Sequence, residues 1–499
     1  MKRCGLARAS VALIVGCWFA GTSPPARSAP QSKIIYVATT GDDHHSGVET
    51  EPLLTLQRAA DIATAGDTIF IRAGQYAPFT IRTVGSAQAP VRFVADAGTY
   101  IKAVGESVDA ITVDGGAWIE VEGFAATSAG GAGLRLRACS AVTARRNQFV
   151  DNSVWGVIVD NCSDVLLDNN EIRGSVRSHG IYLSNGGDRA IVRGNRITSN
   201  TSAGIAVGGD NKSDQDGIIT GTLIEDNVLI SNGVDRSPAI LLDGAVSTVL
   251  RNNVISKSGG AGITLQHKYG GSASTGTLLE HNTIVLMLGA TVAVELQDAA
   301  VDTTVRNNIL VAGIWPIGSR TADELVPEAK GAMAVSLDSL AGLRSDHNVL
   351  TPRLFIGGES VALTLPQWQQ RTRQDKHSVN PLLERLFRDA ANGQFELVDG
   401  SAAVDRGEDS KGVSRDLAGN ARPVGLHVDA GAYEFCTSQT CHPMDRLPDA
   451  PRVGPVAIVT PGPAAVMVPR GCCGGGGPEA VVAPSALVLL AWPRRRRKR

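Results

Sequence analysis

The sequence has few charged and few aromatic residues for its length. Charged side chains make up 19% of the 499 residues and aromatic side chains 4%, whereas hydrophobic residues make up 43% and the mean hydropathy is +0.02. Disorder requires low hydrophobicity and high net charge, so this composition excludes a disordered chain. The 56 glycines and 23 prolines favour turns over helices. We therefore expect one or more folded domains rich in turns.

Positive charge is scarce outside the two ends. Ten of the 47 Lys and Arg residues lie in 1–29 and 494–499, which hold no Asp or Glu, so the stretch between has 37 basic against 49 acidic residues. Nucleic-acid binding needs a basic surface, and this acidic body predicts no nucleic-acid partner. The sequence also lacks a nucleophile elbow, a P-loop, a dinucleotide fingerprint and zinc-ligand spacing, which argues against the corresponding enzymes.

The N-terminal residues 1–29 have the pattern of a secretory signal peptide. Basic residues precede the apolar run Val11–Ala20, and small and proline-rich residues follow it. Ala26–Ser28 offers a cleavage site, while Ile14–Cys17 resembles a lipoprotein box, so simple cleavage and lipoprotein processing both stay open. Export places the cysteines in an oxidising compartment, where disulfides form.

The C-terminal residues 471–499 combine a Gly/Cys-rich run, the apolar segment Ala480–Pro493 and six basic residues. This order resembles the Gly/Cys-rich C-terminal sorting tails of bacterial surface proteins. The apolar segment of about 14 residues is shorter than the ~20 that span a bilayer. We therefore expect a bacterial cell-surface protein whose tail meets the membrane only before it is processed. Residues 436–470, with seven prolines, are expected to form an extended spacer.

A repeated phrase organises the middle of the chain. Each unit contains Gly-apolar-x-apolar, as in Gly180–Leu183, then a turn and a fixed Asn. The steps between successive Asn residues are 23, 25, 32, 26, 29, 26 and 40 residues. Units of this length, built from short alternating apolar segments, indicate a stacked solenoid. The repeated residues are Asn147, Asn170, Asn195, Asn227, Asn253, Asn282, Asn308 and Asn348.

The repeat predicts an all-β right-handed parallel β-helix, in which apolar residues fill the bore and the Asn side chains form a ladder at a turn. Leucine-rich repeats share the period but need a Leu-rich consensus that is missing. The segments Ile35–Asp43, Leu54–Asp61 and Gly66–Tyr76 resemble the entry segment of pectin-lyase-like exported β-helix proteins. That resemblance implies an N-terminal capping helix and first coils within 30–100, followed by repeats over 101–350.

The residues after the repeats resemble a second known module. Asn380–Leu382, Gly400–Gly407 and Asp429–Phe435 are similar to the choice-of-anchor Q type module, which implies a C-terminal module over 380–435 preceded by a connecting segment at 351–379. Two cysteine pairs are close enough to bridge. Cys436 lies five residues before Cys441, and Cys139 and Cys162 lie one coil apart, where they are either bonded or free neighbours.

Long steps in the repeat predict loops that project from the stack. The turns at 208–217 and 266–276 follow the same kind of strand two coils apart, so they leave the same corner. With strands about 4.8 Å apart, the loop bases are expected about 10 Å apart, walling a groove as wide as a sugar chain. We therefore predict that extracellular polysaccharide binds there. Six outward or loop side chains are the expected substrate-binding residues: Tyr182, Lys212, Asp243, Gln266, Tyr269 and Glu295.

Lyase chemistry on a polyuronate would need a base and a cation. Lys268 or His267 could remove the proton beside the substrate carboxylate. Asp210, Asp214 and Asp216 supply the clustered oxygens that Ca²⁺ prefers. The sequence thus points to a Ca²⁺-assisted polysaccharide lyase, if the protein is an enzyme.

Two other functions stay open. A pectin-type glycoside hydrolase is suggested by Ser178–Gly180, which resembles one of that family's active-site tripeptides, but the paired carboxylates of an inverting mechanism are missing. His179 is then a turn residue, and His281 is expected at the surface. Alternatively the protein is a non-catalytic glycan-binding or adhesive surface protein. In each case we expect a monomer.

Overall fold

The computed structural model describes residues 32–210, 216–286, 291–312, 331–358, 361–381, 385–409 and 412–437. The expected signal peptide, the sorting tail and all but the first two residues of the spacer lie outside this part of the chain. Within it, no helix has both the length and the apolarity needed to cross a bilayer.

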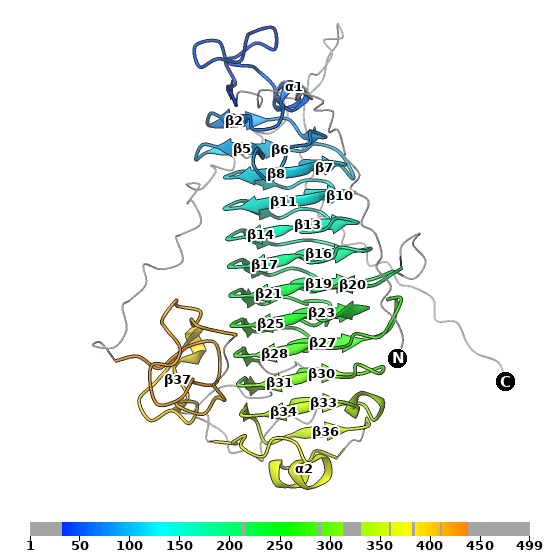
Figure 1. Ribbon diagram of the computed structural model, residues 1–499, viewed down its shortest axis with the longest axis vertical. Coiled ribbons are helices and arrows are strands. Elements are labelled where there is room, and N and C mark those ends of the chain that lie inside the picture. Colours follow the sequence, from blue (N-terminus) through cyan, green and yellow to red (C-terminus); the bar gives the residue numbers. More distant parts are fainter. Residues whose placement is uncertain are drawn as a thin grey trace, which may run out of the picture. The chain divides into compact units, whose positions relative to one another are not determined.

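The chain forms a right-handed parallel β-helix, as predicted (Figure 1). Three parallel sheets of 12, 11 and 11 strands run along the stack, and each coil contributes one strand to each sheet. We call them sheets 1, 2 and 3. A coil passes from sheet 2 to sheet 1 to sheet 3, so the turn after a sheet 2 strand always lies at the same corner.

The strands of each sheet, in chain order, have the following bounds. Sheet 1 contains β1 (Ile34–Val37), β2 (Thr68–Ile71), β5 (Val91–Ala95), β8 (Ala117–Glu122), β11 (Ser140–Arg145), β14 (Leu166–Asp168), β17 (Ile191–Arg193), β21 (Leu223–Glu225), β25 (Val249–Arg251), β28 (Leu278–Glu280), β31 (Thr304–Arg306) and β34 (Arg344–Asp346). Sheet 2 contains β4 (Phe79–Ile81), β7 (Ile111–Asp114), β10 (Ala132–Arg137), β13 (Trp155–Asp160), β16 (Ile181–Ser184), β19 (Ile205–Gly208), β23 (Ile240–Asp243), β27 (Ile263–Gln266), β30 (Val292–Leu296), β33 (Gly331–Val335) and β36 (Leu354–Ile356). Sheet 3 contains β3 (Gly74–Tyr76), β6 (Thr99–Lys102), β9 (Ala125–Thr127), β12 (Gln148–Val150), β15 (Glu171–Arg173), β18 (Arg196–Thr198), β22 (Val228–Ile230), β26 (Val254–Ser256), β29 (Thr283–Val285), β32 (Ile309–Val311) and β35 (Val349–Leu350).

Inward-facing apolar residues alternate with outward-facing residues along each strand, and the inward ones form the core. In β16, Ile181 and Leu183 point into the bore and are fully buried, whereas Tyr182 between them points outward and is half-buried. Equivalent inward positions stack from coil to coil, because the register places Ile181 beside Ile205. The bore is therefore a continuous column of mostly aliphatic side chains, with Phe93, Phe124 and Phe149 among them.

The predicted Asn ladder is present at the turn between sheets 1 and 3. The backbone N–H of Asn147 and its Nδ2 both donate to Oδ1 of Asn170, at 3.0 and 3.1 Å, and the pattern repeats down the stack to Asn348. All eight ladder residues are buried. The residue before each has a positive φ, as at His281 and His347, which lets the chain turn the corner.

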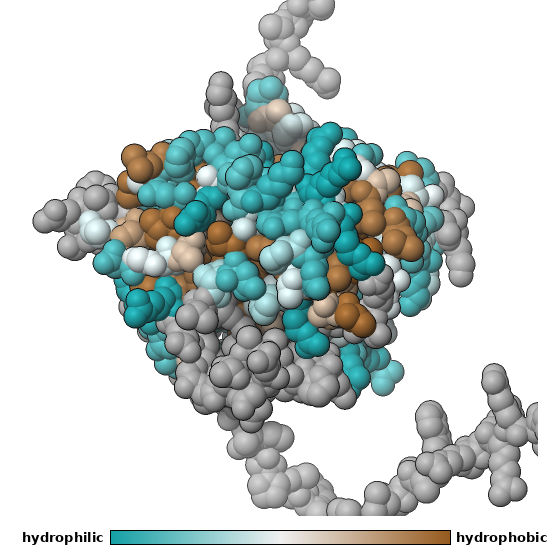
Figure 2. Space-filling model, turned by 90° about the horizontal axis from the view of Figure 1, so that it is seen from below, coloured by the Kyte–Doolittle hydropathy of each residue, from teal (hydrophilic) through white to brown (hydrophobic). Residues whose placement is uncertain are grey.

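A helix closes each end of the bore. The helix α1 (Leu56–Ile62) buries Leu56, Ala59 and Ala60, as expected for an N-terminal cap, and the Gln57 side chain bonds both backbone groups of Thr80 on the edge strand β4. At the other end, α2 (Leu365–Thr372) buries Leu365 and Trp368. Figure 2 looks at the molecule from below, at this end, and shows hydrophilic side chains interspersed with smaller hydrophobic patches.

The stack extends beyond the predicted boundary at residue 350. The strand β36 adds a sheet 2 rung inside the segment 351–379, which was expected only to connect two domains, and α2 lies in the same segment. The boundary was missed because the last coil has no further ladder Asn to mark it. Ser378 takes that place, since its Oγ accepts from the backbone N–H of Asn348 at 2.9 Å.

The C-terminal residues of the described part pack against one side of the coils (Figure 1), over the sheet 3 strands β26, β29 and β32. They include a short antiparallel pair, β37 (Phe387–Asp389) and β38 (Gln394–Leu397). Within this C-terminal region, the buried Arg422 donates to the Glu434 carboxylate of the same region and to Asn252 of the coils. His281 is buried beneath this region, so the expectation that it lies at the surface was wrong: Asp429 and Asn307 bond its ring.

One disulfide links neighbouring coils. Cys139 and Cys162, for which the sequence left bonded and free states open, are bonded, and their Cα atoms lie 4.5 Å apart. Cys436 is also a disulfide cysteine, while Cys441 lies outside the described residues.

Candidate functional site

Most predicted site residues lie where the sheet 2 strands end. The two outward columns expected from the repeat are in register: Tyr182 lies beside Ala206, Ala206 lies beside Leu241, and Asp243 lies beside Gln266. The strand ends Asp160, Ser184, Gly208, Asp243 and Gln266 therefore form one line across five coils. We call this line, with the turns that follow it, the strand-end corner.

Asp243 organises the corner from below the surface. Its side chain is 3% exposed, and its carboxylate accepts hydrogen bonds from the backbone N–H groups of Lys268, Tyr269 and Gly270 at 2.9–3.2 Å. Nε2 of Gln266 donates to the same carboxylate at 3.0 Å. With these bonds made, Asp243 holds the turn after β27 in place, and its predicted contact with substrate stays a prediction.

The turn that Asp243 holds presents the predicted base. Lys268 and His267 are exposed, and Tyr269 is 54% exposed. The Lys268 ammonium lies 5.1 Å from the centre of the Tyr269 ring, and Nε2 of His267 lies 3.1 Å from the Gly270 carbonyl oxygen. Lys268 is thus the more available of the two, because the His267 ring is used within the turn.

Tyr182 lies in the neighbouring outward column, two coils from Asp243 and next to a glycine that makes room for it. A Cβ on Gly208 would lie 3.1 Å from the Tyr182 ring, which explains the glycine at this strand end. Burial, and then the negative charges of Asp210, Asp160 and Asp243, raise the pKa of Tyr182. The corner therefore carries three carboxylates close to Tyr182. Asp160 is part of it, although the sequence did not single it out as a site residue.

The predicted metal ligands are only partly placed. Asp210 is half-buried at the end of β19, and Asp216 uses Oδ1 to accept from the backbone N–H of Ile218 at 3.0 Å. Asp214 and Lys212 lie outside the described residues. The described residues alone therefore do not assemble a three-carboxylate Ca²⁺ site, and that site stays a prediction. Glu295 lies one coil beyond the turn and accepts from Thr264 at 3.4 Å.

The two long turns touch instead of walling a groove. The N–H of Gly271 donates to the carbonyl oxygen of Gly217 at 2.7 Å, and Gly209 donates to Asp243 on the coil between them. The loop bases lie two rungs apart, as expected, because Gly208 pairs with Asp243 and Asp243 with Gln266. The turns meet because the intervening coil turns at Gly244, where a Cβ would lie only 2.7 Å from the Gly270 Cα. Without a side chain there, the neighbouring turns close over the middle coil.

His179 lies beside Tyr182 and is a structural residue. Its ring centre is 5.3 Å from that of Tyr182, and its Nδ1 accepts from the backbone N–H of Ala203 at 3.1 Å. Burial lowers the pKa of His179 to about 4, with Asp235 opposing the shift. These contacts agree with the prediction that His179 is a turn residue. A neutral ring that already accepts a hydrogen bond cannot serve as a general acid.

This pKa predicts a loss of stability in mild acid. The unfolded histidine binds a proton below about pH 6.5, whereas the folded one binds it only near pH 4, so folding is disfavoured as pH falls between these values. We expect the wild type to lose up to about 3 kcal/mol more than His179→Asn over this interval. Urea unfolding at both ends of the interval measures it. Equal losses in both proteins would contradict the assignment, because oppositely shifted groups such as Asp226 are common to both.

A basic groove that the sequence did not predict crosses the outer face of sheet 1. It has a volume of about 540 Å³ and is lined by β28, β31 and β34, by the segment after α2, and by Glu408. Arg306 in its wall is paired with Glu280 and Glu408. Three exposed cations, Arg344, Arg373 and Lys376, have no ion-pair partner among the described residues. No repeat pattern marks them, because two lie beyond the last coil.

Comparison with known proteins agrees with this architecture. The family described as right handed beta helix region matches residues 155–323, and the family described as periplasmic copper-binding protein (NosD) matches residues 61–228. In solved structures, pectate lyase Pel9A is similar with a TM-score of 0.59 and 15% sequence identity, covering 81% of this chain and 97% of that one. The fold is that of a pectate lyase.

A curated relative has higher sequence identity over a shorter stretch. Pectate lyase PEL9 of Emericella nidulans is 37% identical over 83 residues, which is 16% of this chain. The match spans 20% of the fungal protein, so its activity is not transferred to this chain by the match alone.

Proposed function

We propose that this exported β-helix protein binds an acidic polysaccharide at the strand-end corner and cleaves it as a polyuronate lyase. The observation that carries the proposal is the turn after β27, where the buried Asp243 fixes the backbone and leaves Lys268 exposed beside Tyr269. The likeness to pectate lyases adds support. Such a turn presents a base and a stacking ring at a fixed place on a rigid sheet edge.

The reaction needs two proton transfers and one bond cleavage. The neutral Lys268 amine takes the proton from the carbon beside the substrate carboxylate, and the electron pair forms a C=C bond as the glycosidic C–O bond breaks. The leaving oxygen takes a proton from water and ends as a hydroxyl on the departing sugar chain, and Lys268 returns its proton to solvent.

Ca²⁺ fits the charge of this corner. Asp210 and Asp160 raise the pKa of Tyr182 after burial does, and carboxylate oxygens are the ligands that Ca²⁺ prefers. Asp210 and Asp216, with Asp214, are the residues that we propose hold the ion. A bound Ca²⁺ would neutralise the substrate carboxylate and so make the adjacent proton easier to remove.

Binding without catalysis is the second candidate, and the basic groove favours it. Arg344, Arg373 and Lys376 present unpaired positive charge across an opening of about 540 Å³, which suits the carboxylates of a uronate chain. In this case the strand-end corner would be an ordinary polar surface.

One set of assays separates the two functions. The purified protein is incubated with polygalacturonate, alginate and glycosaminoglycans, with and without Ca²⁺, and unsaturated product is measured by its ultraviolet absorbance. Binding of the same polymers is measured by calorimetry for the wild type and for Arg344→Glu/Lys376→Glu. Lys102→Glu/Lys257→Glu, at two exposed positions away from the groove, is the control with the same change in net charge.

Each outcome decides between the candidates. Product formation supports the lyase. No product, but binding that falls at least about 10-fold in the groove variant and not in the control, supports the binder. No product from, and no binding to, any of these polymers would contradict both.

A further inference from the structure

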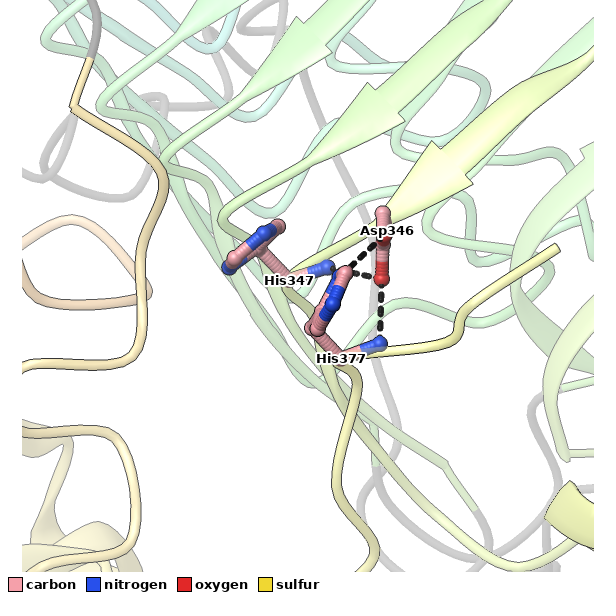
Figure 3. Close-up of side chains that lie close together, drawn as sticks. All are labelled: Asp346, His347 and His377. Atoms are coloured by element: carbon pink, nitrogen blue, oxygen red, sulfur yellow. Dashed lines mark hydrogen bonds and ion pairs between the residues drawn. The ribbon is translucent and has the colours of Figure 1, made fainter.

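A cluster of two histidines and one aspartate lies at the edge of the basic groove (Figure 3). Asp346 ends β34, and His347 follows it in the positive-φ position before the ladder residue Asn348. His377 comes from the segment after α2. One potential ligand atom from each residue lies within 4.8 Å of the others, and the described part of the chain contains no other such group of three.

The backbone brings His377 to this place. After α2 the chain returns alongside the last coil, where the N–H of Asp375 donates to the Ser345 carbonyl and that of Val379 to the Asn348 carbonyl, at 2.6 and 2.9 Å. The buried carboxylate of Asp375 accepts from Trp368, Ser345 and Asn348. Both segments that carry the cluster, the last coil and the segment after α2, are therefore held in place by hydrogen bonds.

Hydrogen bonds orient the carboxylate of the cluster. Oδ1 of Asp346 accepts from the backbone N–H groups of His347 and His377 at 2.9 and 2.7 Å. Its Oδ2 faces Nδ1 of His377 at 2.8 Å. Two ligands at ~2.1 Å from one ion are about 3.0–3.4 Å apart, so this pair needs little movement to bind a metal together.

The second histidine has one nitrogen prepared for a ligand role. Nδ1 of His347 lies 3.0 Å from the carbonyl oxygen of Arg406, which can only accept, so Nδ1 carries the proton. Nε2 is then left with its lone pair, as in metal sites where a backbone carbonyl fixes the tautomer of a ligand histidine. The two imidazole rings stack with their centres 4.9 Å apart, which keeps His347 beside the Asp346–His377 pair.

We propose that Asp346, His347 and His377 bind a divalent transition-metal ion, Zn²⁺ or Cu²⁺. Two imidazole nitrogens and one carboxylate oxygen form a ligand set for these ions and not for Ca²⁺ or Mg²⁺, which prefer oxygen ligands alone. Three protein ligands leave at least one position for water or an anion. The groove cations Arg344 and Lys376 oppose the charge of the ion, so the affinity is moderate.

The test is metal titration of the full-length protein by calorimetry, with Zn²⁺ and with Cu²⁺. We expect His347→Asn/His377→Asn to lose at least about 10-fold in affinity at one site. The control is His427→Asn, since His427 is 59% exposed against 65% for His377 and pairs with Asp409 at 3.1 Å without a third ligand among the described residues. Cysteines in the chain are common to all variants, so their metal uptake cancels in the comparison.

Spectroscopy gives an independent result. Cu²⁺ bound to the wild type should show electron-spin coupling to two imidazole nitrogens, and the double variant should lose it. Equal Zn²⁺ and Cu²⁺ binding by the wild type and the double variant would overturn the proposal. So would equal loss of metal in His427→Asn.

Discussion

Replacing Arg422 by methionine should lower the free energy of unfolding by about 3–5 kcal/mol, because it leaves a buried carboxylate without its cation. The guanidinium and the Glu434 carboxylate are both fully buried and lie 2.5 Å apart. The same guanidinium donates to the Gly431 carbonyl at 2.8 Å and to Oδ1 of Asn252 at 3.2 Å. It thus joins the C-terminal region to the coils, and its loss should weaken both.

Urea unfolding followed by circular dichroism measures this effect. Arg415→Met is the matched control, because Arg415 is exposed and donates only to the nearby Gly419 carbonyl, so we expect a change below about 1 kcal/mol. Arg422→Met/Glu434→Met should recover part of the loss, since it removes the unpaired charge as well. Equal effects of Arg422→Met and Arg415→Met would show that the buried pair does not hold the region in place.

Replacing Lys268 by alanine should reduce kcat/KM for the polyuronate about 100- to 10,000-fold if Lys268 is the general base. The fold of the turn should survive, because Asp243 binds the backbone N–H of residue 268 and not its side chain. The loss should therefore fall on kcat with KM nearly unchanged. Initial rates of unsaturated product formation give both constants.

Lys257→Ala is the control for this variant, since Lys257 is an exposed lysine at another corner of the stack. It should retain the wild-type rate. Full activity of Lys268→Ala would exclude Lys268 as the base. His267 would then be tested in the same way, although its ring nitrogen already lies against the Gly270 carbonyl.

The fold was predictable because each coil repeats the same physical requirements. A buried Asn must satisfy its amide in the next coil, and this fixes the step between Asn147 and Asn170 at one full turn. The alternating apolar residues of β16 likewise fixed which side chains face outward, so the columns through Tyr182 and Asp243 were foreseen in register. The Asn spacing and the apolar alternation can be recognised in a single sequence because they recur in many coils.

The candidate sites were less predictable because they depend on single contacts. Nothing in the repeat indicates that Gly244 lets two long turns meet. Nor does it indicate that the carboxylate of Asp243 is covered by the backbone N–H groups of the turn after β27. The Asp346–His347–His377 cluster needs the chain after α2 to return to the last coil, a contact between residues 31 positions apart. A histidine before a ladder Asn has the appearance of a turn residue, as His281 indeed is.

The helices at the two ends also bear on how copies of the protein meet. A stack of parallel strands ends in open backbone groups, which are a template for another molecule to extend the sheets into a fibre. Here the Gln57 side chain bonds the backbone N–H and C=O of Thr80 on the edge strand β4, as a neighbouring strand would. At the far end, the backbone of Leu363 pairs with that of Leu354 on the edge strand β36. Both templates are thus partly used by the chain itself, which disfavours end-to-end polymerisation of the folded protein.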